Sequence, residues 1–114
     1  LFMADAGIDI EDEIMGKYLL EPDIVKVGHH GSVTASSQEF ATKTAPEYAI
    51  VSVGENTYGL PDEEALANWQ AAGADVLRTD REGTISFTYL PVVPWRIIRT
   101  YSKGEPWFCQ KPFS

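Results

Sequence analysis

Residues 24–32 read Ile-Val-Lys-Val-Gly-His-His-Gly-Ser, and they predict a short strand that runs into a glycine-bracketed histidine pair. The first four residues are mostly apolar and β-branched, which indicates a strand. Glycines on both sides of the pair permit close backbone approach and dihedral angles that other residues avoid. The stretch therefore places both histidines of the chain, His29 and His30, at the carboxyl end of a strand.

The histidine pair is the strongest chemical signal of the chain. Histidine is a common metal ligand and an acid or base near neutral pH. Adjacent side chains on an extended segment point in opposite directions, although a glycine-flanked turn can relax this. One metal ligand beside one structural histidine is the simplest interpretation, and two hydrogen-bonded loop histidines without a function are the alternative. We expect His29 and His30 to be catalytic and metal-binding residues.

Two carboxylates follow other predicted strands. Asp5 ends the predicted strand 1–4, where it can bind a metal or cap the following helix. Asp62 comes after the predicted strand 48–53 and its loop, where it can bind a metal or simply cap a helix. Neither Ser32 nor Cys109 lies in a sequence motif typical of a catalytic nucleophile, so the sequence does not favour covalent catalysis.

The rest of the pattern alternates strands and helices. A helix is predicted over residues 8–20, a second begins at Ser36 and is stopped by Pro46, and a third begins at Pro61 or Asp62 and is closed by Gly73. Strands are predicted at 74–79 and 84–89, joined as a hairpin by the turn 80–83, and at 95–101, followed by a tail. This order predicts an α+β layered fold.

Composition limits the functions that remain. The chain has 114 residues, so it forms at most one domain, and its net charge is −8. Residues 1–89 carry 5 basic and 16 acidic side chains, a net charge of −11, whereas residues 90–114 carry a net charge of +3. A generic nucleic-acid-binding protein should be basic. One cysteine excludes an internal disulfide, and no apolar run reaches the roughly 20 residues of a membrane helix.

The first residues are unusual for a natural N-terminus. Residues 1–4 read Leu-Phe-Met-Ala, with no initiator methionine and no basic signal-peptide region. The apolar run leads directly into an acid, as in a buried strand already in progress. We therefore expect this chain to be a piece of a longer polypeptide.

Several segments carry a family resemblance: Ala4-Asp5, residues 23–32, residues 48–56, Tyr58-Gly59 and residues 78–83. In this order they resemble the C-terminal half of a metallo-β-lactamase-like hydrolase domain, closest to that of the DNA-internalisation competence family ComEC. The resemblance covers residues 1–89. Residues 90–114 are left as a C-terminal extension, partly strand and partly irregular.

The resemblance implies an αββα sandwich, of which this chain would supply a mixed sheet with helices packed on one face. It also implies two divalent ions, zinc or manganese, that activate water against a phosphodiester such as DNA. Asp5 matches the family's bridging carboxylate. His29 and His30 match its histidine pair.

Two departures bear on activity. The family's N-terminal His-x-His-x-Asp-His cluster is absent, and its His-Pro-His loop reads Leu60-Pro61-Asp62 here. A carboxylate can bind manganese or zinc, so Asp62 can replace one histidine, whereas Leu60 cannot bind a metal. Two hypotheses therefore stand. The chain is a segment of a metal-dependent hydrolase, or it is a degenerate, metal-free module with a scaffold or protein-interaction role.

Half a sandwich leaves one sheet face uncovered. We expect that face to meet the missing N-terminal half of the domain, or a second copy of the chain in a homodimer. The isolated segment is expected to lack hydrolase activity and membrane contact, and to be soluble. The resemblance places its parent in a bacterial membrane.

Overall fold

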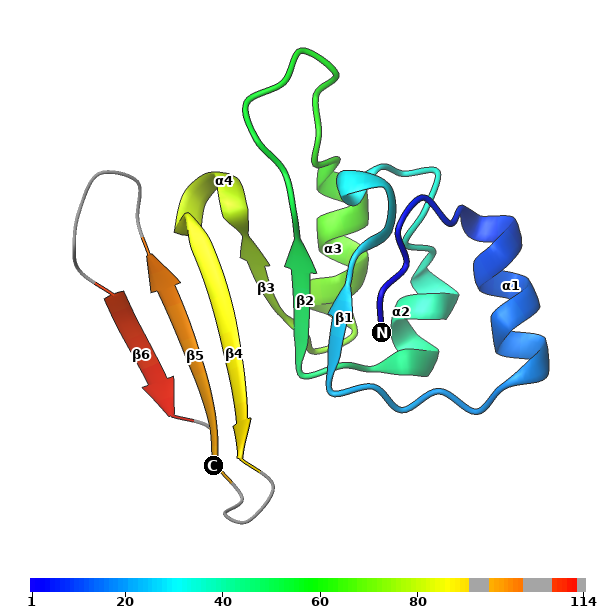
Figure 1. Ribbon diagram of the computed structural model, residues 1–114. Helices are drawn as coiled ribbons and strands as arrows, with labels where there is room; N and C mark the ends of the chain where they lie inside the picture. Colours follow the sequence, from blue (N-terminus) through cyan, green and yellow to red (C-terminus); the bar gives the residue numbers. More distant parts are fainter. Residues whose placement is uncertain (91–94, 102–107, 113–114) are drawn as a thin grey trace.

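The computed structural model describes residues 1–90, 95–101 and 108–112, with side chains described as far as residue 88. Two three-stranded sheets and a set of helices make up an α+β fold, as predicted (Figure 1). The first sheet is parallel, in the order β1-β2-β3. Its strands are β1 (Ile24–Lys26), β2 (Tyr48–Val51) and β3 (Asp75–Arg78).

The second sheet is an antiparallel meander in the order β4-β5-β6. Its strands are β4 (Thr84–Leu90), β5 (Trp95–Tyr101) and β6 (Phe108–Pro112). The strand β5 confirms the prediction for residues 95–101, and β6 lies within the segment predicted as a tail. The helices are α1 (Ile8–Lys17), α2 (Gln38–Thr44), α3 (Glu63–Ala71) and the short α4 (Thr79–Glu82), with a tight turn η1 (Gly28–Gly31) after β1.

Helices cover one face of the parallel sheet. Along β2, the alternate residues Ala49 and Val51 are fully buried against this helical layer. Phe40 of α2 and Trp69 of α3 meet above them edge to face, with ring centroids 6.0 Å apart. This face therefore holds the main core, and the expectation of helices on one face of the sheet is confirmed.

The opposite face of the same sheet contacts the meander. Tyr48 and Leu77 are buried there, with Ile85 and Phe87 of β4 packed against them. The rings of Tyr48 and Phe87 lie 5.8 Å apart in an edge-to-face arrangement. The layers thus run from helices through the parallel sheet to the antiparallel sheet (Figure 1).

The predicted hairpin between residues 74–79 and 84–89 is wrong, and with it the single mixed sheet. The strand β3 pairs with β2, and β4 pairs with β5, so the two belong to different sheets. Residues 79–82 form the helical turn α4 rather than a tight β-turn. A four-residue helical turn redirects the chain, and β4 crosses to the far face of the parallel sheet.

Three boundaries also differ from the predictions. The first helix ends at Lys17, because Tyr18 is extended; Leu19 is then exposed, whereas Leu20 packs against the core from outside the helix. The second begins one residue later than predicted, since the Ser37 hydroxyl accepts the Phe40 N–H at 3.1 Å. The predicted strand 1–4 is reduced to one parallel bridge between Phe2 and Lys26, because Ala4 has a φ of 48°. Within the described residues, no helix is long and apolar enough to cross a membrane.

Candidate functional site

The histidine pair lies in η1, where the chain leaves the carboxyl end of β1. His29 and His30 both adopt left-handed backbone angles, with φ of 53° in each case. Such angles cost non-glycine residues roughly 1–2 kcal/mol each and are concentrated at functional sites. Both side chains are exposed. The glycine-flanked turn thus replaces the extended arrangement in which neighbouring side chains point apart.

The bracketing glycines are required by close contacts. A Cβ atom on Gly28 would lie 3.0 Å from the Ala6 carbonyl oxygen and 3.2 Å from the Met3 Cβ atom. A Cβ atom on Gly31 would lie 2.6 Å from the Cβ atom of Pro61, and Gly31 has a φ of +80°. No larger residue fits at Gly31 without displacing the loop that carries Pro61.

Hydrogen bonds tie the segment 28–33 to three other loops. The His29 N–H donates to the Ala4 carbonyl at 2.7 Å, so the loop that carries Asp5 lies beside the turn at the carboxyl end of β1. The His30 ring nitrogen Nδ1 lies 2.7 Å from the Ser52 carbonyl oxygen. The Asp62 N–H donates to the Gly31 carbonyl at 2.8 Å. Residues that are far apart in sequence are therefore held around one short turn.

The bond to Ser52 fixes the tautomer of His30. A carbonyl oxygen can only accept, so Nδ1 must carry the proton in this bond. In the neutral ring, the other nitrogen, Nε2, then keeps its lone pair. A neutral imidazole oriented in this way is suited to bind a metal or to accept a proton.

Asp5 and Asp62 share this edge but differ in their contacts. Asp5 is exposed, and it does not cap α1, because Gly7 occupies the N-cap position. Asp62 occupies the N-cap position of α3 without a capping bond from its side chain. Its Oδ2 atom instead accepts the Val33 N–H at 2.7 Å, so Asp62 anchors the loop after the histidines.

The donor types at this edge suit zinc or manganese, since imidazole nitrogen and carboxylate oxygen both bind these ions. The structure brings Asp5, His29, His30 and Asp62 to one edge of the parallel sheet. Among the described side chains, no group of three or more His, Cys, Asp or Glu is arranged to hold a metal ion.

Glu11 is a residue that sequence analysis did not single out. It is 1% exposed, although it looked like one of several first-turn acids of α1. Its carboxylate accepts the backbone N–H groups of Ser36 and Ser37, the latter at 3.0 Å. Only its burial distinguishes it from the neighbouring acids, and the sequence pattern does not predict which of these acids is buried.

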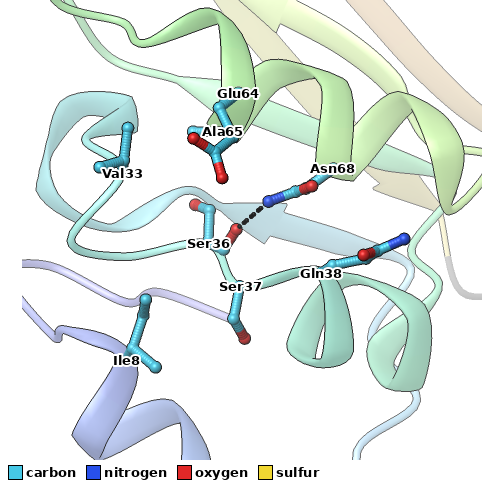
Figure 2. Close-up of a pocket in the computed structure, with 8 residues that line it drawn as sticks. All are labelled: Ile8, Val33, Ser36, Ser37, Gln38, Glu64, Ala65 and Asn68. Atoms are coloured by element: carbon cyan, nitrogen blue, oxygen red, sulfur yellow. Dashed lines mark hydrogen bonds between the residues drawn. The ribbon is translucent and has the colours of Figure 1, made fainter.

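We call the two hydrogen bonds from Ser36 and Ser37 to the Glu11 carboxylate the Glu11 clamp. A cavity of about 240 Å³ lies beside it, between the starts of α1, α2 and α3 (Figure 2). Ser36 lines it with a buried hydroxyl that has no hydrogen-bond partner among the described residues. Asn68 donates from Nδ2 to the Ser36 carbonyl at 2.9 Å. Glu11 and Asn68 together hold Ser36 at a φ of 65°, which shapes the loop that follows the histidines.

The carboxyl ends of β2 and β3 are joined by polar contacts. The Thr79 hydroxyl accepts the Val53 N–H and donates to the Val53 carbonyl, both at 2.8 Å. Arg78 donates to Asp80 from Nε at 3.0 Å and from Nη2 at 2.7 Å. This pairing raises the pKa of Arg78 and lowers the pKa of Asp80, chiefly through the side-chain hydrogen bonds.

Comparison with known proteins relates the chain to competence proteins. It is 40% identical over 81 residues to ComE operon protein 3 of Bacillus subtilis (strain 168), which covers 69% of the chain and 10% of that protein. It is 40% identical over 90 residues to Competence protein ComA of Neisseria gonorrhoeae, covering 76% of the chain and 13% of that protein. Recombination protein 2 of Haemophilus influenzae is 25% identical over 100 residues, or 87% of the chain and 13% of that protein.

The chain therefore spans about a tenth of the length of the curated relatives it matches. No protein-family model and no solved structure matches it.

Proposed function

We propose that this chain is a segment of a metal-dependent hydrolase of the metallo-β-lactamase superfamily that acts on the phosphodiesters of DNA during competence. Two relatives named as competence proteins or competence-operon products, each 40% identical over more than two thirds of the chain, support the link to competence. The hydrolase assignment rests on the sequence resemblance and on the turn that carries His29 and His30 at the carboxyl ends of the parallel strands.

The observation that carries the proposal is the construction of the turn 28–31. The two exposed histidines lie on a strained backbone, and each flanking glycine lies too close to its surroundings for a larger residue. Three hydrogen bonds join this turn to other loops. Exposed side chains contribute little to folding, so such a costly frame is better explained by a role in binding. Backbone hydrogen bonds of the same frame join the turn to Ala4, next to Asp5, and to Asp62.

In this proposal Asp5, His29, His30 and Asp62 would each supply a ligand to zinc or manganese once the rest of the domain is in place, because the described side chains do not form a preassembled metal group in this structure. When bound, the ion supplies Lewis acidity and lowers the pKa of a bound water. The chain's own residues orient the donors. Ser52 turns the Nε2 atom of His30 outward, while the bond from Val33 occupies one carboxylate oxygen of Asp62 and leaves the other for an ion.

The net charge of −11 over residues 1–89 fits this division of labour. A surface rich in carboxylates attracts divalent cations and repels phosphates. The substrate is therefore held chiefly by the metal ions and by uncharged contacts, and the segment alone binds DNA weakly.

We further propose that the remaining ligands come from the missing N-terminal half of the domain, within a longer membrane-associated parent. The strand β4 packs on the sheet face that was expected to be uncovered. Phe2, which pairs with Lys26 beside the edge strand β1, is 83% exposed. This exposed ring suits contact with a second sheet, and a second copy of the chain in a homodimer is the alternative occupant. The chain alone should then show no phosphodiesterase turnover.

A metal-free module is the second candidate function. Leu60 cannot bind a metal, and Asp62 spends one oxygen on the Val33 N–H, as a purely structural anchor would. In that case the domain keeps the fold and serves as a scaffold or interaction surface.

Elemental analysis of the purified chain separates the two candidates. The hydrolase proposal predicts bound zinc or manganese that is lost in a His29→Ala/His30→Ala variant and kept in an Asp12→Asn variant, which removes an exposed acid of α1. Metal that survives the double substitution would contradict the assignment to this turn. Absence of metal from the chain and from a longer parent containing it would support the metal-free module.

A further inference from the structure

The loop between β2 and α3 carries an aromatic side chain that folding does not explain. Tyr58 is 85% exposed, whereas Tyr48 of β2 is 9% exposed and packs against Phe87. An aromatic ring has a large apolar surface whose burial stabilises a protein. Holding such a ring in water gains the fold nothing, and it leaves the face of the ring free to contact a ligand.

The loop is held rigidly around this ring. Asn56 makes four hydrogen bonds inside it, donating to the carbonyls of Gly54 and Leu60 at 2.9 Å each. Its Oδ1 atom accepts the N–H groups of Tyr58 at 3.1 Å and Leu60 at 3.0 Å. The backbone of Tyr58 is therefore fixed directly by a neighbouring side chain, although its own side chain is free of the core.

Both ends of the loop are bonded to the histidine turn. At its start, Ser52 accepts the bond from the His30 ring, and at its end Asp62 is bonded to Gly31 and Val33. The loop stands beyond the carboxyl ends of the parallel strands (Figure 1). Tyr58 thus lies on a loop that is braced internally by Asn56 and bonded at both ends to the histidine turn and the residues after it.

We infer that Tyr58 is a substrate-contacting residue, on which an unpaired nucleic-acid base stacks. This inference rests on the proposed function and specifies its substrate as single-stranded DNA. Base stacking on an aromatic ring does not depend on net charge, so it suits a surface that repels phosphates. Paired bases hide their faces within the duplex, and a stacking contact therefore favours single strands.

Binding of short fluorescent oligonucleotides at low salt with Mn²⁺ tests the inference. A decathymidylate, an abasic decamer of equal charge and a duplex are compared. We expect the wild-type chain to bind the base-bearing strand about tenfold more tightly than the abasic strand, and more tightly than the duplex. Tyr58→Ala should bind both decamers alike, whereas Tyr58→Phe should keep the preference.

Tyr18→Ala is the matched control, because Tyr18 is 64% exposed at the C-terminal end of α1, where its backbone N–H bonds to Ile14 and not to the histidine turn. It should keep the tenfold preference. Equal binding of the two decamers by the wild-type chain, or a preference that survives Tyr58→Ala, would overturn the stacking role. The proposed function would still stand if the histidine-dependent metal were present. No binding of any oligonucleotide would overturn the stacking role alone, because the proposed function already expects the isolated segment to bind DNA weakly.

Discussion

The helix-covered face of the parallel sheet and the edge at its carboxyl ends are built from the same strands, but they treat their side chains differently. On the face, Val25, Ala49 and Val51 are 0% exposed and lie under two packed aromatic rings. At the edge, His29 and His30 are exposed on a strained backbone. The buried side chains of the face raise the free energy of unfolding, whereas the strained backbone at the carboxyl ends lowers it. Substitutions in the two regions should therefore separate effects on folding from effects on binding.

Left-handed backbone angles show the same contrast. Within the described residues, four non-glycine residues with positive φ lie in the loops around the edge, and a fifth ends α2. They are Ala4, His29, His30 and Ser36 at the edge, and Ala45 after α2. Concentrated strain of this kind is expected where geometry serves a site rather than a core.

The largest effect should come from the face. Trp69→Ala removes the largest fully buried side chain and should lower the free energy of unfolding by about 3–5 kcal/mol. Urea denaturation followed by circular dichroism measures the loss. Tyr58→Ala, an equally drastic truncation on the loop, should change the midpoint by no more than the scatter between preparations. A large loss from Tyr58→Ala would remove the contrast between the regions.

The next effect concerns the glycine that the edge requires. Gly31→Ala should cost about 2–4 kcal/mol, because it adds a methyl group 2.6 Å from the Pro61 Cβ atom at a left-handed position. Gly59→Ala is its control, since Gly59 has a similar φ of +74° but no atom within 4 Å. Gly59→Ala should cost about 1 kcal/mol. Equal losses at the two glycines would refute the close contact.

The buried clamp should give a smaller loss. Glu11→Gln replaces one acceptor oxygen by an NH₂ group that faces a backbone N–H of Ser36 or Ser37, at an expected cost of about 1–3 kcal/mol. Glu13→Gln removes an exposed carboxylate paired with Lys17 and should cost less than about 0.5 kcal/mol. Hydrogen exchange at the two serine amides should accelerate in the first variant. Unchanged exchange there would exclude the clamp.

The smallest effect depends on pH. The Arg78 partner lowers the folded-state pKa of Asp80 below its ordinary value of 3.8, so the pair stabilises the fold fully above that value. This contribution is lost as the pH falls through the lowered pKa. Asp80→Asn should therefore cost about 0.5–1 kcal/mol at pH 7, with the gap to wild type closing in acid. Thermal unfolding at pH 7 and pH 3 checks this, and a pH-independent gap would contradict it.

Hydrophobic periodicity predicted the elements of the face well. Strands around Val25 and Ala49 and a helix around Trp69 are where the pattern put them, because burial on both sides of a sheet leaves a continuous apolar run. The pairing of β3 was not predictable in this way. An apolar strand fits a hairpin or a parallel neighbour equally, and the choice depended on the four-residue helical turn α4.

At the carboxyl ends of the parallel strands, residue types predicted the unusual turn but not the hydrogen bonds that hold it. The glycines beside the histidines pointed to an unusual turn, and the structure shows one. The anchoring role of Asp62 and the clamp by Glu11 arise from tertiary contacts more than 20 residues apart in sequence. In the sequence, Asp62 and Glu11 resemble ordinary acids at a helix start, because local spacing does not predict which backbone N–H donates to a carboxylate.

Nitrogen NMR of the histidine rings during a Zn²⁺ titration tests whether the edge is a metal-binding site. The geometry predicts that His30 is protonated on Nδ1 before metal is added, and that its Nε2 resonance moves on binding while Nδ1 keeps its proton and its bond to Ser52. A His30 that carries its proton on Nε2, or that shows no change at saturating Zn²⁺, would contradict the account.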